Sequence, residues 1–106
     1  MKVNIHAHNV EIVESLRSYA EVKVLKLDRH FDRVLEAHLD FEVEGLHHTE
    51  PARVARLRLH LAGAEILASV TASSWMATVD KVVDKADEQL RRRKERLKDH
   101  KAGLPG

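Results

Sequence analysis

The second half of the chain contains a regularly spaced set of cations. Between residues 75 and 100 the apolar positions recur every three or four residues, which predicts one long amphipathic helix. Four basic side chains lie within roughly 60° of one another on this helix and are expected to point away from the core: Lys81, Lys85, Arg92 and Arg96. We call these four residues the basic stripe. Cations spaced in this way along one exposed face are typical of surfaces that follow a phosphate backbone.

Most acidic residues of the same helix are predicted to lie on one flank, which leaves the basic stripe largely unneutralised. The acids on this flank are Asp80, Asp84, Asp87 and Glu95. A run of four cations at 91–94 adds positive charge towards the helix C-terminus. Two interpretations remain open, a solvated helix face with i,i+4 ion pairs or a nucleic-acid-binding surface. The separation of the two signs favours the second.

Eight histidines make a metal site the next candidate. His6 and His8 fall on one face of a predicted strand, where two imidazoles would lie together. His47 and His48 form a second pair in a predicted turn. No acid stands at convincing ligand spacing and the chain has no cysteine, so we expect no metal and no other cofactor. Surface histidines that titrate near neutral pH, some of them touching phosphate, are the simpler interpretation.

Catalysis is not expected. An enzyme needs a positioned nucleophile or a pair of carboxylates in a pocket, and the sequence pattern predicts neither. The absence of cysteine also excludes thiolate catalysis and disulfide bonds. A binding protein is therefore the favoured class.

Charge is distributed unevenly along the 106 residues. Residues 1–50 hold six Lys/Arg against ten Asp/Glu, a net −4, whereas residues 51–106 hold twelve against seven, a net +5. A nucleic-acid partner is therefore expected to meet the second half, although the whole chain carries only +1. The first residues lack the apolar run that a secretory signal or a membrane helix requires, so we expect a cytoplasmic protein without membrane contact.

Two periodicities alternate along the chain and define the elements that position these residues. Alternation of apolar and polar side chains predicts four strands, at about 2–8, 35–44, 55–61 and 65–71. Spacing of three or four predicts two helices, at about 10–28 and 75–100. Turn residues separate the last three strands.

The same pattern predicts the helix ends and the core positions. Asn9 is expected to cap the first helix, and Ser73 or Ser74 the second. Trp75 is interpreted as a lid on the core rather than a platform for a nucleobase. The predicted core stripes of the two helices are Val13, Leu16, Ala20, Val24 and Leu27, and Met76, Val79, Val83, Ala86, Leu90 and Leu97.

The predicted order is strand, helix, three strands, helix. It corresponds to an α+β fold, a two-layer sandwich with a four-stranded sheet and both helices on one face. The first helix connects two strands that are expected to be parallel. The outer face of 35–44 is acidic and that of 55–61 is basic, so antiparallel pairing places opposite charges across from each other. We predict one domain over 1–102 and a short flexible tail at 103–106.

Five segments together resemble the short form of the ribosome hibernation promoting factors, the family of the ribosome-associated inhibitor also called protein Y. Some members of this family carry the label sigma-54 modulation protein. The segments cover nearly the whole chain and are NIHAHNVEI at 4–12, LDRHFDRV at 27–34, GAEI at 63–66, VDKADEQL at 83–90 and KERLKDH at 94–100.

The resemblance implies a β-α-β-β-β-α fold that binds the small ribosomal subunit and its rRNA near the decoding centre. Translation would be inhibited reversibly under stress, which promotes ribosome hibernation. A second hibernation factor is a further candidate partner, and the free protein is expected to be a monomer because no exposed apolar stripe is left over. The implied RNA contacts are Lys81, Lys85, Arg91, Arg92, Lys94, Arg96 and Lys98 on the last helix, with Arg29 and Arg33 after the first helix.

The alternative from another class is a protein–protein regulatory module. The sigma-54 label points to such a role, and a basic stripe can equally meet an acidic protein surface. Steep salt dependence favours RNA as the partner, because neutralised phosphates release counterions.

Overall fold

The computed structural model describes residues 1–29, 34–45 and 51–103. Its strands and α-helices follow one another in the predicted order, so the α+β fold class is confirmed. They are strand β1 (Lys2–His8), helix α1 (Glu14–Leu25), the short 3₁₀ helix η1 (Lys26–Arg29), strands β2 (Val34–Glu44), β3 (Ala52–Leu61) and β4 (Ala64–Ala72), and helix α2 (Trp75–Gly103).

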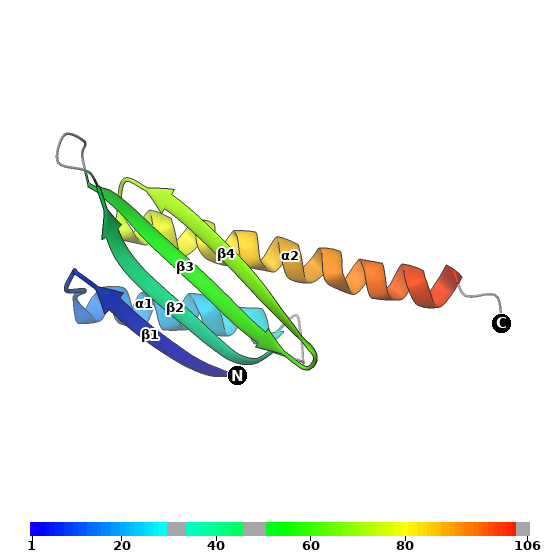
Figure 1. Ribbon diagram of the computed structural model, residues 1–106. Helices are drawn as coiled ribbons and strands as arrows, with labels where there is room; N and C mark the ends of the chain where they lie inside the picture. The colour runs from blue at the N-terminus through cyan, green and yellow to red at the C-terminus, as the bar shows by residue number, and fades with distance from the viewer. Residues whose placement is uncertain (30–33, 46–50, 104–106) are drawn as a thin grey trace.

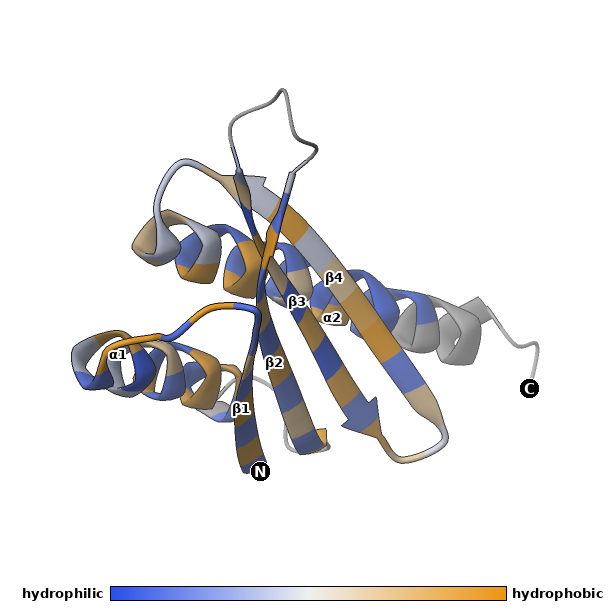
Figure 2. Cartoon of the chain, turned by 60° about the vertical axis from the view of Figure 1, so that its left-hand side comes forward, coloured by the Kyte–Doolittle hydropathy of each residue, from blue (hydrophilic) through white to orange (hydrophobic). Residues whose placement is uncertain are grey.

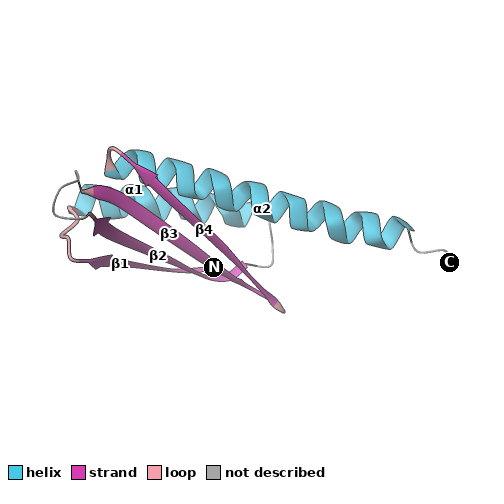
Figure 3. Ribbon diagram, turned by 45° about the horizontal axis from the view of Figure 1, so that its top comes forward, coloured by secondary structure: helices cyan, strands magenta, loops and turns pink. Residues whose placement is uncertain are grey.

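The four strands form one mixed sheet in the order β1-β2-β3-β4. β1 pairs with β2 in parallel, as predicted, and the other two pairs are antiparallel. Both helices cover the same face of the sheet, while the other face is open to solvent (Figure 1, Figure 3). α2 lies behind β3 and β4, and α1 lies beside it, behind β1.

Alternation of hydropathy along the strands separates a core face from an outer face (Figure 2). At the centre of β2 and β3 the core face is fully buried, with Leu39, Phe41 and Leu59 all 0% exposed. The predicted charge pairing on the outer face is confirmed, since the guanidinium of Arg56 forms ion pairs with Glu42 and Glu44 across the strand boundary. Hydrogen bonds to these two carboxylates raise the pKa of Arg56 above its ordinary value, and the bond to Glu44 has the larger effect.

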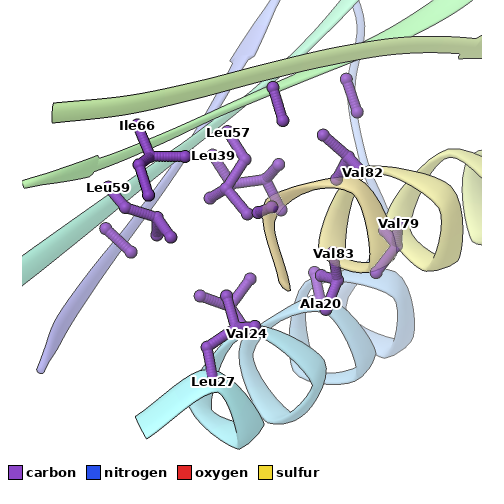
Figure 4. Packing of buried hydrophobic residues seen from close by; sticks show 14 of the residues in the cluster. Ala20, Val24, Leu27, Leu39, Leu57, Leu59, Ile66, Val79, Val82 and Val83 are labelled. Atoms are coloured by element: carbon purple, nitrogen blue, oxygen red, sulfur yellow. The ribbon is translucent and has the colours of Figure 1, made fainter. Parts of the chain in front are cut away.

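The core lies between the sheet and the two helices, where side chains from all three meet (Figure 4). Val24 of α1 and Val79 of α2 are 0% exposed within this layer. Trp75 closes one end of this layer, with its ring edge-to-face against Phe41 at a centroid distance of 5.4 Å. The guanidinium carbon of Arg53 lies 5.9 Å from the centroid of the same indole ring. Trp75 is partly buried against the core cluster, as expected for the predicted lid.

The start of the first helix was predicted wrongly. Helix α1 begins at Glu14 rather than near residue 10, and its N-cap is Val13, which makes no side-chain capping hydrogen bond. Asn9 instead adopts a left-handed conformation with φ of 59°, which turns the chain out of β1. Asparagine tolerates this conformation better than most residues, so a turn competes with a cap at this position.

The second helix follows its prediction more closely. The Ser74 hydroxyl accepts a hydrogen bond from the Ala77 amide at 3.2 Å, which confirms one of the two predicted caps. The helix continues to Gly103, the first residue of the predicted tail, and 104–106 lie outside the described residues. Met76 was assigned to the core but is 53% exposed, whereas Val82 is 0% exposed. Val82 is buried because α2 packs against the sheet and α1 together, which widens its core face.

Leu57→Ala is expected to lower the free energy of unfolding by about 2–5 kcal/mol, because Leu57 is buried at the centre of the sheet and its truncation leaves a cavity. Leu67→Ala is the matched control. Leu67 is 64% exposed on β4, and its truncation is expected to change stability by less than about 0.5 kcal/mol. Urea denaturation followed by circular dichroism measures both, and equal destabilisation would contradict the assignment of the two faces.

Candidate nucleic-acid interface

Helix α2 has a packed half and a projecting half. Its inner face is buried through Leu90, which is 3% exposed, and Leu90 is the last core residue among those whose side chains the structure describes. Beyond this point the helix extends past the sheet (Figure 1). Arg91, Arg92, Lys94 and Arg96 lie in this projecting part and are exposed. Continuity with the packed half therefore holds them in a fixed helical array.

One flank of α2 lies against the free edge of β4. The Lys85 ammonium donates a hydrogen bond to the Ser69 carbonyl at 3.1 Å, and the Gln89 amide donates to the Leu67 carbonyl at 2.9 Å. β4 is an edge strand, so carbonyls on its free side have no strand partner. These two side chains satisfy the carbonyls and fix the rotation of α2 about its axis.

The opposite flank of α2 is tied to α1. The Tyr19 hydroxyl donates a hydrogen bond to Asp80 at 2.5 Å, and the Lys23 ammonium lies 3.4 Å from the same carboxylate oxygen. Hydrogen bonding to Asp80, with desolvation, raises the pKa of Tyr19. The pKa of Lys23 is also raised, by Coulomb attraction to Tyr19 and then to Asp80. Asp80, one of the acids predicted on a separate flank, therefore faces α1.

The four members of the basic stripe are exposed on α2. One of them, Lys85, does not point straight into solvent but reaches the edge of β4. The reason is that α2 packs beside β4 as well as over the sheet, so part of the surface opposite the core faces that strand. A helical wheel contains no information about such an edge.

A groove runs between α2 and the β4 edge, with a volume of about 580 Å³. We call it the α2–β4 groove. Three members of the basic stripe line it together with Arg93, which the site prediction omitted. The charged groups of the groove are Lys85, Arg92, Arg93 and Arg96 against Glu65 and Glu88. This excess of cations suits an anionic ligand.

One member of the basic stripe forms an ion pair in the structure. Arg92 pairs with Glu88 at 2.5 Å, and Arg91, which lies beside the stripe, pairs with Asp87 at 3.2 Å, both at i,i+4 spacing. Glu88 is not one of the four acids predicted on the flank, and it reaches Arg92 along the helix. Both side chains of the Arg92–Glu88 pair are exposed, that of Arg92 at 68% and that of Glu88 at 53%. Such pairs contribute little stability, and a phosphate can compete for the guanidinium.

The structure describes the side chains of only some of the remaining predicted RNA contacts. Lys81 and Lys94 are exposed on α2. Arg29 ends η1 and Lys98 lies within α2, but their side chains are outside the described residues, and so is all of Arg33. Arg93 and Glu65 are among the groove residues that the site prediction missed. The run of cations at 91–94 was a signal for the first, whereas only the tertiary structure brings β4 beside α2.

The other candidate chemistries find no support in the described part of the chain. His6 and His8 are exposed on β1, yet no three His, Asp or Glu side chains in that part converge as a metal-ligand set. His47 and His48 lie outside the described residues. Neither helix, over the residues described, has the length and apolar content that crossing a bilayer requires.

Comparison with known proteins identifies the family. The model of the family described as "Sigma 54 modulation protein / S30EA ribosomal protein" matches residues 3–98. The chain belongs to this family. A member named ribosome hibernation promoting factor, from Escherichia coli (strain K12), is 38% identical over 100 residues, which are 94% of this chain and 100% of the relative. The Azotobacter vinelandii protein of the same name is 35% identical over 103 residues, 97% of this chain and 92% of the relative.

Two solved structures share the fold. A ribosomal subunit interface protein from Coxiella burnetii superposes with a TM-score of 0.79 at 23% identity, covering 90% of this chain and 99% of the other. The Thermus thermophilus Protein Y N-terminal domain gives a TM-score of 0.72 at 26% identity, covering 87% of this chain and 98% of the other. The resemblance to the short-form hibernation factors is thus confirmed.

Asp80→Asn is expected to lower the pKa of Tyr19 towards that of a free tyrosine, because the substitution removes the carboxylate that raises it. Tyr19 is the single tyrosine of the chain, so ultraviolet absorbance titration reports its ionisation alone. Asp84→Asn, on the same helix and exposed, is the control and should leave the titration unchanged. An unchanged curve for Asp80→Asn would show that the link between α1 and α2 does not form in solution.

Proposed function

We propose that this protein binds the small ribosomal subunit near the decoding centre and reversibly inhibits translation during stress, which promotes ribosome hibernation. The observation that carries the proposal is the array of exposed cations on the projecting half of α2, in a chain 38% identical to a ribosome hibernation promoting factor over nearly its full length. The relatives support a ribosome-associated role without catalysis, in which the protein acts by occupying a site.

The rRNA contact surface is proposed on α2. Phosphate binding needs exposed cations at a spacing that follows a backbone, and the described cations beyond Leu90 meet this requirement. Loose i,i+4 pairing keeps Arg91 and Arg92 extended along the helix while leaving them open to competition. The full proposed set is Lys81, Lys85, Arg91, Arg92, Lys94, Arg96 and Lys98, with Arg29 and Arg33 as further contacts.

A protein–protein role is the second candidate. The family description includes sigma 54 modulation, and the same cations would suit an acidic protein surface. The two candidates differ in salt dependence, because RNA binding releases condensed counterions in proportion to the phosphates neutralised.

Co-sedimentation with separated ribosomal subunits on density gradients, at low and high salt, tests the proposed function. We expect salt-sensitive migration with the small subunit and with intact ribosomes. Absence from every ribosomal fraction at low salt would overturn the proposal and favour a protein partner.

A double charge reversal, Arg92→Glu with Arg96→Glu, is expected to abolish this co-sedimentation without unfolding the protein, because both side chains are exposed. Where residual binding to RNA is measurable, its salt slope should fall by about two, one for each phosphate that is no longer neutralised. Lys2→Glu with Arg58→Glu is the matched control, with the same charge change on β1 and β3 of the outer sheet face. Equal weakening by both double variants would show that net charge, rather than α2, controls binding.

The free protein is proposed to be a cytoplasmic monomer, with a second hibernation factor as a further partner. Exposed large apolar side chains among the described residues are spread over different elements, including Val22 on α1, Leu35 on β2 and Met76 on α2. Sedimentation velocity should give one monomer mass at all concentrations, and a concentration-dependent mass would contradict this part of the proposal.

A further inference from the structure

A titratable pair stands at the rim of the α2–β4 groove. His60 of β3 and Glu65 of β4 are partners in the antiparallel register, with 3.8 Å between imidazole Nδ1 and carboxylate Oε1. Both side chains are about half exposed, at 53% and 51%. Glu65 also lines the groove, opposite the arginines of α2. The charge of His60 therefore acts on a carboxylate that belongs to the groove.

We propose that the α2–β4 groove binds the phosphate backbone of a single RNA strand, and that the His60–Glu65 pair makes this binding tighter at mildly acidic pH. The inference rests on the proposed function and adds to it the path of the RNA and a means of regulation.

The walls of the groove suit a phosphate chain. Arg92 and Arg96 line it from successive turns of α2, with Arg93 next to Arg92, so their guanidinium groups can meet neighbouring phosphates. Lys85 adds a fourth cation near the β4 edge, where the Ser69 carbonyl takes one of its three ammonium donors. Because Lys85 and Gln89 both anchor α2 to β4, the groove exists before the ligand arrives.

Two carboxylates oppose an anion in this groove. Glu88 is paired with Arg92, so its charge is already compensated within the helix. Glu65 pairs with His60, and that pair is ionic only when the imidazole is protonated. With neutral His60, Glu65 repels a phosphate in the groove, and with protonated His60 the pair carries no net charge. Protonation therefore favours binding, and affinity should rise as pH falls.

Other charged side chains also lie near His60 on β2 and β3. Glu36 of β2 lies opposite His60 in the register, and Arg58 precedes it by two positions on β3. Glu36 also contacts Asn4 and His38, and both helices lie on the other face of the sheet. Imidazole is the side chain whose charge changes between about pH 5 and 8, whereas carboxylates and guanidinium groups do not titrate there.

The experiment measures the dissociation constants of a fluorescent uridine oligonucleotide and of small ribosomal subunits at fixed ionic strength, from about pH 8 to about pH 5.5. We expect wild-type affinity to increase by about two- to fivefold over this range, the scale of one exposed charge interaction. His60→Gln should show a weaker, flatter profile. Glu65→Gln should bind more tightly than the wild type at every pH, since the repelling carboxylate is gone, and its affinity should still rise as pH falls because His60 keeps its imidazole.

His8→Gln is the matched control for proton effects elsewhere in the system. His8 also contacts a carboxylate, with 3.3 Å between its Nε2 and Oδ1 of Asp40, but it is at the other end of the sheet from the β3–β4 turn. Its profile should follow the wild type, and thermal melts should show that every variant is folded.

The path of the RNA is tested separately with Arg93→Gln, which removes a cation of the groove that is not part of the basic stripe. Weaker binding with a smaller salt slope supports the groove, and unchanged binding overturns it. Identical pH profiles for wild type and His60→Gln overturn the proton effect while leaving ribosome binding intact. Failure of the wild type to bind at any pH overturns the proposed function as well.

Discussion

The packing of α2 across β3 and β4 is the constraint on which the rest of the structure depends. Val79, Val82 and Ala86 are each 0% exposed on the inner face of this helix. Leu90 is the last buried residue of that face among the described side chains. The following turns extend past the sheet (Figure 1). The projecting half of α2 is too short to form a stable helix in isolation. The packed half therefore supplies the helical nucleus from which the projecting half continues. A charged helix can project only because its apolar half is anchored.

The free edge of β4 sets the rotation of that helix. Lys85 and Gln89 reach across to carbonyls that the sheet leaves unpaired, so a polar requirement of the strand positions a cation of the groove. On the other flank Tyr19 holds Asp80 and directs one acid of α2 away from the groove. Positive and negative charge are thus separated by what each flank contacts, and one side of α2 keeps an excess of cations.

The outer sheet face and the helix side differ in how their charges are used. On the outer face, Arg56 bridges Glu42 and Glu44, and His38 contacts Glu36, so neighbouring strands compensate one another. Exposed pairs of this kind contribute little stability but help to fix the strand register. On the helix side, the run at 91–94 exceeds the acids available to pair with it. An anionic partner is therefore attracted mainly to one side of the molecule.

The amino-acid sequence by itself determined the element order, the parallel first pair and the charge-paired register, because strand alternation and helical spacing are local patterns that burial enforces. It also placed the basic stripe on α2 and the cap at Ser74. It did not predict the turn at Asn9, where two local roles compete, or the burial of Val82, which depends on two packed neighbours. The groove and the His60–Glu65 pair at its rim were decided by tertiary structure alone, because Glu65 meets α2 only once β4 lies beside that helix.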